Sequence, residues 1–372
     1  MIAPPSSVST AQKQRVPYWD NARWIAIVLV VVGHAILKLI GESDPAYELY
    51  LFIYAFHVPL FVAVSGYFAK AAPPGMRQMR RLLTDVIFPY LIFETIWTTV
   101  RWANGGKFWL DYSTASWTLW FLLALALWRI GLPYLAMLRY PLLISIVISV
   151  AAGYLSGIDS TFALSRTFGL LPFFVFGWKV RQWGLTANWL KLAPASIWRW
   201  RTASLALFTA LAVFIVLNIG WLREIKIRRF LLYNEPYPSF GYPEFWAGGI
   251  RLAVILLSCI LVIAFLMLVP RRRTWFTAFG AATMYIYLLH TFLLYPFRET
   301  GILDGPQPPW VLPAMLLLSV GIAVLLSLPF VQRWFQPIVQ PRAQWIFRDR
   351  ITQKTGAIRV PKSAAKKDPS GT

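Results

Sequence analysis

Cysteine, histidine and acidic residues are scarce in this chain of 372 residues. The single cysteine, Cys259, lies in an apolar run, which excludes both a disulfide framework and a cysteine metal cluster. Asp and Glu number 15 against 36 Lys and Arg, so the formal charge is +21. No sequence period of roughly 20–50 residues recurs, which excludes solenoids and propellers. The organisation of the chain must therefore be sought in its apolar segments.

Apolar residues dominate the composition. Hydrophobic residues make up 58% of the chain and charged residues 14%, and the mean hydropathy is +0.57. These values exclude an ordinary soluble fold and predict a multi-pass protein of the cell (plasma or inner) membrane. In a soluble domain the positive charge would suggest nucleic acid. Here the basic residues stand between and beside apolar runs, where they set topology, so nucleic acid is not an expected partner.

Apolar runs of roughly 17–25 residues, the length that crosses a bilayer as a helix, predict about ten transmembrane helices. They lie near residues 24–40, 48–69, 82–100, 117–137, 141–157, 167–180, 203–222, 250–269, 275–297 and 311–331. The short sixth run would also fit a tilted or re-entrant element packed against protein. The predicted fold class is an all-α integral membrane protein. Its parts are a cytoplasmic N-terminal segment 1–17, a transmembrane domain 18–331 and a basic, disordered cytoplasmic tail 332–372. The polar start lacks a cleavage site, so the first span is expected to be retained.

The distribution of Lys and Arg predicts that both termini are cytoplasmic. Basic residues cluster before the first span and after the second, sixth, eighth and tenth spans, whereas the loops between carry acidic residues. One loop disagrees, since residues 223–249 carry four basic residues on the predicted outer side. They are Arg223, Lys226, Arg228 and Arg229. We accept the exception because a basic outer loop could meet an anionic ligand or a lipid headgroup.

Four titratable residues fall at a similar depth in the predicted membrane. At a rise of about 1.5 Å per residue, His34, His57, His290 and Glu94 all lie in the outer half of their spans. Ionisable side chains are costly inside a membrane, so their convergence predicts a functional site. The alternative is that each forms a separate hydrogen bond between helices.

Arg23 and His34 are eleven positions apart, which is about 20° from three full helical turns, so they share one face of the first span. Their separation along the axis is about 16 Å. One extended ligand could therefore meet both, with a phosphate at Arg23 on the inner side and a reactive end at His34. Alone, Arg23 would fit a snorkelling arginine that sets topology.

The stretch Tyr18-Trp-Asp-Asn-Ala-Arg23 through Gly33-His34 resembles the R-x10-H signature of the membrane-bound acyltransferase 3 family, most closely its fucose 4-O-acetylase-related subgroup. Further segments match in order over about residues 18–331. They are Phe56-His57-Val58-Pro59-Leu60-Phe61 to Ser65-Gly66-Tyr67, Pro89-Tyr90, Trp120-Phe121-Leu122, Arg166 with Leu171-Pro172-Phe173-Phe174 and Gly177, and Tyr287-Leu288-Leu289-His290. Thr84-Asp85 depart from the pattern where a further basic residue is expected. No hydrolase-like domain follows the last span, so the chain is expected to act alone or with a separate partner.

The resemblance implies transfer of an acyl group, usually acetyl, from cytoplasmic acyl-CoA to a hydroxyl of an extracytoplasmic sugar, glycolipid or cell-envelope glycan. We predict that His34 is the general base that takes the acceptor proton. His57, His290 and nearby Tyr or Trp groups are candidate donors to the oxyanion. Glu94 could orient an imidazole or shuttle the proton, or it could pair helices. An acyl-histidine intermediate is a variant of this mechanism.

Other polar residues have two interpretations each. Arg80 and Arg81 either set topology or contact a CoA phosphate. Arg166 and Arg298, on the predicted outer side, either frame the acceptor or lie in headgroups. Ser65 is interpreted as a small residue in a close helix contact, because no G-x-S-x-G elbow surrounds it. No metal is expected, because three histidines on three helices lack the second carboxylate or cysteine set that usually accompanies them.

A rival function is a proton-coupled transporter of a small anion or sugar, which would also bury His and Glu at depth. Against it, the sequence has no repeated half and no pair of matched broken helices. A membrane scaffold that binds partners would leave the buried histidines unexplained. Thioester cleavage would distinguish the acyltransferase from both.

Overall fold

The computed structural model describes residues 15–341 and 346–347. Within these ranges the chain is helical apart from one isolated bridge between Thr114 and Thr161. The first half contains α1 Pro17–Ala35, η1 Leu39–Gly41, α2 Asp44–Tyr54, α3 His57–Phe68, α4 Met76–Leu82, η2 Leu83–Ile87, α5 Phe88–Ala103, α6 Trp120–Ala136, α7 Pro141–Ala152 and α8 Leu164–Gln182. The second contains α9 Leu185–Lys191, α10 Pro194–Leu217, α11 Ile219–Glu224, α12 Ile227–Leu232, η3 Tyr237–Phe240, α13 Ala247–Leu268, η4 Thr277–Ala282, α14 Thr283–Glu299, α15 Val311–Leu326 and α16 Pro329–Val339. The all-α prediction is confirmed for the described part of the chain.

Every predicted run contains a helix, but fewer helices qualify as spans by length and composition. Within the described residues, four helical stretches are long and apolar enough to cross a membrane, namely Asp44–Phe68, Pro194–Leu217, Ala247–Leu268 and Thr277–Glu299. The pair α15 and α16, bent by 75°, would make a fifth. The chain is an integral membrane protein. The number ten and the side of each terminus stay predictions, because helices such as α7, with 12 residues, are too short to cross alone.

The predicted termini fall largely outside the described residues. The structure describes neither residues 1–14, at the start of segment 1–17, nor residues 348–372, which make up most of segment 332–372. Helix α16 includes the beginning of the segment that was expected to be a disordered tail.

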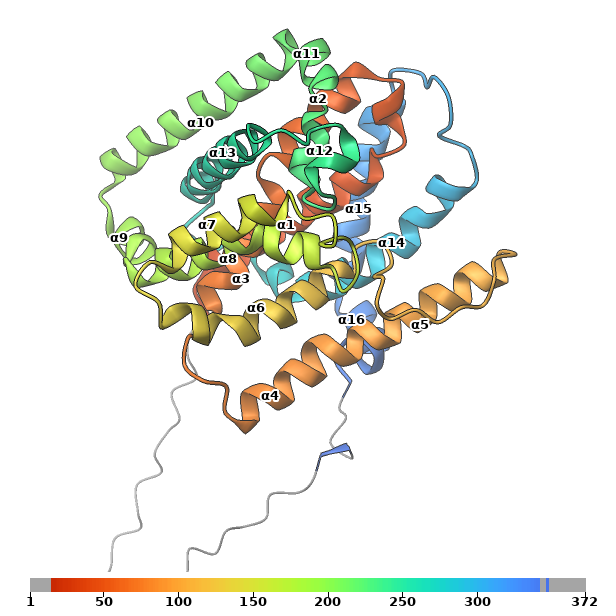
Figure 1. The fold of residues 1–372 in the computed structure, drawn as a ribbon, viewed down its shortest axis with the longest axis horizontal. Coiled ribbons are helices and arrows are strands. Elements are labelled where there is room, and N and C mark those ends of the chain that lie inside the picture. Colours follow the sequence, from red (N-terminus) through yellow and green to blue (C-terminus); the bar gives the residue numbers. More distant parts are fainter. Residues whose placement is uncertain (1–14, 342–345, 348–372) are drawn as a thin grey trace, which may run out of the picture. The chain divides into compact units, whose positions relative to one another are not determined.

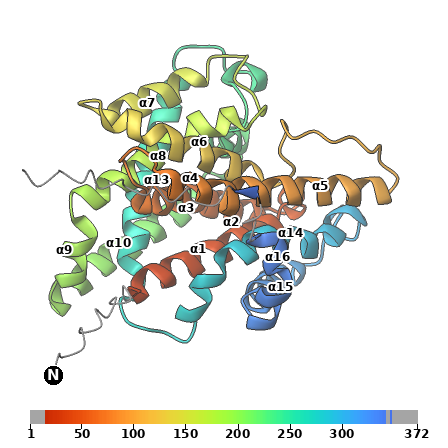
Figure 2. The ribbon, with the colours of Figure 1, turned by 90° about the horizontal axis from the view of Figure 1, so that it is seen from below.

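Two predicted spans are interrupted near polar residues. The run 48–69 divides into α2 and α3, and Phe56 between them has φ −144° and ψ −21°. His57 is therefore the first residue of α3 and lies at the break within the candidate span Asp44–Phe68. The run 82–100 contains the π-helical turn η2, and α4, η2 and α5 follow one another as a nearly continuous rod (Figures 1 and 2). Such turns occur frequently at functional sites.

Helices α3 and α8 cross at very short range. A Cβ added at Gly66 would overlap the backbone carbonyl of Phe174, and one added at Gly177 would overlap that of Ala63. Only glycine allows the two backbones to approach this closely. Helix α10 lies along the outside of the bundle beside α13 (Figure 1), and its largely exposed apolar surface suits contact with lipid.

The first helix is attached to a segment far along the chain through Asn21. Its amide nitrogen donates to the carbonyls of Pro270 and Arg272, each at 3.0 Å. Its amide oxygen accepts from the hydroxyls of Thr274, at 3.1 Å, and Thr277, at 2.7 Å. These four bonds fix the end of α1 from which Arg23 projects.

Candidate active site

Two histidines from opposite ends of the sequence meet in the core. The ring centroids of His34, in the last turn of α1, and His290, in the middle of α14, are 5.4 Å apart. His290 is fully buried, and its Nε2 has no hydrogen-bond partner among the described residues. His34 is half-buried, and its Nδ1 is likewise buried without a partner there. The ring atoms that chemistry would use are therefore not engaged in structural hydrogen bonds.

Backbone contacts fix the tautomers of His290 and His57. Nδ1 of His290 lies 2.9 Å from the carbonyl oxygen of Ile286, and Nδ1 of His57 lies 2.9 Å from that of Ile53. Because a carbonyl oxygen can only accept, each Nδ1 carries the proton that it donates. In the neutral ring, Nε2 is then an acceptor. As neutral side chains, His57 and His290 therefore cannot donate through Nε2 to an oxyanion and would instead accept a proton or a hydrogen bond.

Tyr54 links His57 to the His34 segment. The rings of Tyr54 and His57 meet edge to face with centroids 4.4 Å apart. The Tyr54 ring also packs against α1, since a Cβ added at Gly33 would lie 3.0 Å from its Cε2. His57 itself is within electrostatic range of His34. The structure thus brings the three predicted histidines into one neighbourhood.

Glu94 has different partners. Its carboxylate is fully buried and accepts from the backbone N–H of Ser116 at 2.8 Å, from the Ser116 hydroxyl and from Arg101 at 3.5 Å. Arg101 also donates to the Ser116 hydroxyl at 2.6 Å. The hydrogen bonds of Glu94 within the described chain hold the loop before α6 to α5. Of the two interpretations left open by the sequence, these contacts favour the structural one.

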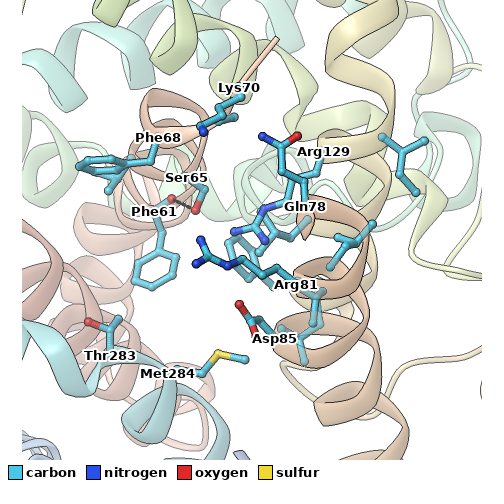
Figure 3. A pocket seen from close by; sticks show the side chains of 18 of the residues that line it. Phe61, Ser65, Phe68, Lys70, Gln78, Arg81, Asp85, Arg129, Thr283 and Met284 are labelled. Atoms are coloured by element: carbon cyan, nitrogen blue, oxygen red, sulfur yellow. Dashed lines mark hydrogen bonds between the residues drawn. The ribbon is translucent and has the colours of Figure 1, made fainter. Parts of the chain in front are cut away.

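A cavity of about 550 Å³ opens beside Arg23, a size typical of small-molecule sites. Figure 3 shows Phe61, Ser65 and Phe68 on one side of it and Gln78, Arg81, Asp85 and Arg129 on the other. Its lining includes four basic side chains, Arg23, Lys70, Arg81 and Arg129, and one acidic side chain, Asp85. The excess of positive charge suits an anionic ligand.

The lining residues modify the sequence prediction for a phosphate site. Of the predicted pair Arg80 and Arg81, only Arg81 is among the residues that line the cavity. Arg129 was missed by our sequence analysis. The signal was an arginine inside the apolar run 117–137, where a charged residue is costly and usually functional. It shares one face of α6 with Phe121 and Leu125, at intervals of four residues, and all three line the cavity.

The end of the cavity away from Arg23 approaches the histidines. Tyr287 belongs to the lining and lies three residues, about one turn, before His290 on α14. Ala26 also lines it and lies eight residues, about 12 Å, before His34 on α1. At the other end the Arg23 guanidinium lies 4.4 Å from the centre of the Phe68 ring and 3.5 Å from Asp20. A ligand extended along α1 would pass from a basic mouth toward the histidine pair.

The Ser65 hydroxyl lines this cavity too and donates to the Phe61 carbonyl at 2.9 Å. The close helix contact expected at Ser65 is made by its neighbour Gly66.

The two predicted outer arginines stack on tryptophans near the start of α6. The guanidinium of Arg298 lies 3.7 Å from the centre of a Trp117 ring, and that of Arg166 lies 4.8 Å from a Trp120 ring. Both arginines are within electrostatic range of His34. Trp117 has a positive φ of 51°, a conformation that is unusual for a bulky residue. The Glu94–Ser116 contact beside it holds this part of the loop.

Among the described residues, no group of three or more His, Cys, Asp or Glu is arranged to hold a metal ion.

Comparisons with known proteins agree with the motifs. A family model described as an acyltransferase domain, that of acyltransferase 3, matches residues 16–328. The chain is also similar to the nodulation protein NolL of Mesorhizobium japonicum, with 38% identity over 92 residues. The aligned part covers 22% of this chain and 23% of that protein. No solved structure matches. Because the family model covers most of the helical bundle, the chain belongs to the acyltransferase 3 family.

Proposed function

We propose that the protein transfers an acyl group, in the simplest case acetyl, from cytoplasmic acyl-CoA to a hydroxyl of an extracytoplasmic sugar, glycolipid or cell-envelope glycan. Membership of the acyltransferase 3 family supports the acyl transfer. The similarity to a segment of NolL adds no acceptor, because it covers only 23% of that protein. The cell membrane as location and cytoplasmic termini belong to the same proposal.

One observation carries the proposal. Arg23 stands at a basic cavity and His34 stands two further turns beyond its inner lining on the same helix, next to His290. Acyl-CoA has the matching shape, since its phosphates are joined to the reactive thioester by a long, thin arm. Arg23, Arg81, Arg129 and Lys70 would bind the phosphates, as guanidinium and ammonium groups commonly do. The thioester would then reach the neighbourhood of His34.

The chemistry assigned to His34 is general base catalysis. Its neutral imidazole accepts the proton of the acceptor hydroxyl while that oxygen forms a bond to the thioester carbonyl carbon. The tetrahedral intermediate collapses, the C–S bond breaks, and the sulfur of the leaving CoA takes the proton from His34. His290 acts beside it as an acceptor through Nε2, as its Nδ1–H contact with Ile286 requires. Arg166 and Arg298 frame the acceptor.

The test is turnover of labelled acetyl-CoA by the purified, membrane-inserted protein. His34→Ala should lower transfer or hydrolysis by at least about a hundredfold while acetyl-CoA still binds, because only the base is removed. Arg23→Ala and Arg129→Gln should instead weaken acetyl-CoA binding by about tenfold or more, because each removes a charged hydrogen-bond donor to phosphate. Arg139→Gln is the matched control, since Arg139 is exposed at the end of the α6 segment and stacks only on Tyr140.

A wild-type protein that neither binds nor consumes any acyl-CoA would contradict the donor assignment. Proton-coupled transport of a small anion or sugar would then become the leading explanation.

A further inference from the structure

Several basic residues on the predicted outer side are paired with a carboxylate. Arg223 pairs with Asp44 at 2.7 Å, Arg229 pairs with Glu235 at 2.8 Å, and Lys38 pairs with Asp304 at 2.7 Å. Arg298 lies 3.5 Å from Glu299. These pairs account for part of the basic loop that contradicted the expected charge distribution.

Two other arginines have no such close ion pair, although Glu235 acts on Arg166 at longer range. No carboxylate of the described residues lies within 4.0 Å of Arg228 or of Arg166. Nε of Arg228 donates to the Tyr50 hydroxyl at 3.4 Å, and its guanidinium lies 5.5 Å from the Tyr50 ring centre. Arg166 stacks on Trp120. Both arginines are half-buried.

These two arginines converge on Tyr54, which lies beside His34. Both are within electrostatic range of the Tyr54 hydroxyl. The rings of Tyr50 and Tyr54 stack with centroids 3.8 Å apart, so Arg228 is connected to Tyr54 through Tyr50. Tyr54 in turn packs against Gly33, the residue before His34. Arg228 is thus connected through Tyr50 and Tyr54 to the segment that carries the proposed base.

Arg251 of α13 is a third cation without a carboxylate partner in the described chain. It is buried over the rings of Tyr233 and Tyr237, at 4.2 and 5.1 Å, and these rings are the aromatic partners that the structure gives it, instead of Tyr50 or Tyr54.

A half-buried guanidinium has lost part of its hydration, and a paired anion is the usual compensation. Its planar fork matches a carboxylate or a phosphate in two parallel hydrogen bonds. We propose that the acceptor carries a negatively charged group, bound by Arg166 and Arg228, which directs a nearby hydroxyl to His34. This inference rests on the proposed acyltransferase function and narrows its acceptor class. The charge could belong to a uronate carboxylate of the glycan or to the phosphate of a lipid carrier.

The experiment compares three acceptors with labelled acetyl-CoA and the full-length protein in nanodiscs. One is a glucuronate-containing tetrasaccharide, the second is the same tetrasaccharide with its carboxyl groups reduced to alcohols, and the third is that neutral tetrasaccharide on a prenyl phosphate. Binding of each acceptor is measured in parallel by its effect on thermal stability. The first and third probes distinguish the two sources of negative charge, and the reduced sugar is the neutral match.

The proposal predicts that one charged acceptor is used at least about tenfold more efficiently than the neutral one. Arg228→Gln and Arg166→Gln should remove that preference by raising KM for the charged acceptor, because a charge-assisted hydrogen bond is lost. Arg228→Lys should retain part of it, because the charge remains without the fork. Arg229→Gln is the control and should keep the full preference, since Arg229 is already paired with Glu235.

Equal use of charged and neutral acceptors, or a preference that survives both Gln variants, would overturn the proposal. It would also fall if acetyl-CoA were consumed while neither charged probe bound or was acetylated. In both cases the donor assignment would stand. Failure to bind or consume acetyl-CoA would instead count against the proposed function. If the protein then still gained thermal stability from a charged acceptor, that result would support the anion site.

Discussion

At the scale of single residues, one hydrogen bond decides what each buried histidine can do. The Ile286 carbonyl accepts from Nδ1 of His290 and leaves Nε2 as an acceptor without a partner among the described residues, on a ring 5.4 Å from that of His34. We propose that during catalysis this nitrogen accepts the N–H of His34, so that the opposite nitrogen of His34 faces the acceptor hydroxyl. Such an orienting contact is a common companion of a catalytic imidazole.

This role predicts a selective defect in His290→Asn. The asparagine amide can still donate to the Ile286 carbonyl, but Nε2 is removed. We expect kcat to fall by about a hundredfold while KM for acetyl-CoA stays within about twofold of the wild-type value. In His57→Asn the asparagine amide can likewise donate to the Ile53 carbonyl while Nε2 is removed. This substitution should lower kcat less, because the His34 ring lies against His290. An unchanged kcat in His290→Asn would show that His290 is only a packing residue.

The histidines can be recognised in the sequence because titratable residues are conspicuous in an apolar run. Arg129 also lies in an apolar run, but our sequence analysis did not select it. The basic residues were considered mainly as markers of topology in the loops. The partners of Glu94 could not be assigned from the sequence either. The carboxylate meets Ser116 through a loop whose path depends on tertiary structure, and helical spacing says nothing about such a contact.

At the scale of helices, the crossing of α3 and α8 is the closest contact that we describe. Each backbone presents a glycine to a carbonyl of the other helix, Gly66 to Phe174 and Gly177 to Ala63. The crossing holds Phe61 and Ser65 at the cavity wall. The position of one cavity wall is thus set by two residues without side chains.

We expect Gly177→Ala to destabilise the protein strongly. The added methyl group would meet backbone, which cannot rotate away, and overpacking of this kind costs at least about 1–3 kcal/mol. The thermal midpoint in detergent should drop by about 5 °C or more. Gly321→Ala is the matched control, since Gly321 is an exposed glycine of α15 with nothing within 4 Å of its added Cβ. Equal midpoints for the two variants would contradict the crossing.

The positions of the helices followed from hydrophobic runs, but their interruptions did not. The run 48–69 is apolar throughout, yet the helix breaks before His57. Hydrophobicity sets which residues enter the membrane, whereas a break depends on what packs around the freed backbone groups. For the same reason the π-helical turn at Thr84 and Asp85 was visible in the sequence only as a departure from the family motif.

At the scale of the whole molecule, the orientation of the chain across the membrane can be tested directly. The charge distribution predicts that residues near 77 lie on the cytoplasmic side of the membrane and that residues near 300 lie on the outer side. The single cysteine makes a direct test simple, because Cys259→Ala gives a background free of thiols.

On that background, Thr300→Cys should react with a membrane-impermeant maleimide in intact cells. Arg77→Cys should react only after the membrane is permeabilised. Both positions are exposed in the structure, so access to the reagent is limited by the membrane alone. Labelling of Arg77→Cys in intact cells would reverse the topology, and with it the sides assigned to donor and acceptor.

The Asn21 contacts have a consequence for how the protein is made. Asn21 hydrogen-bonds to residues that follow it by 249 to 256 positions, so the ribosome must synthesise most of the chain before these partners exist. Until then the first helix lacks the contacts that fix its rotation. A nascent or truncated chain that stops short of Pro270 would carry Arg23 and His34 without the anchor that aligns them. The enzyme would therefore stay inactive through most of its own synthesis and become competent only near the end of translation.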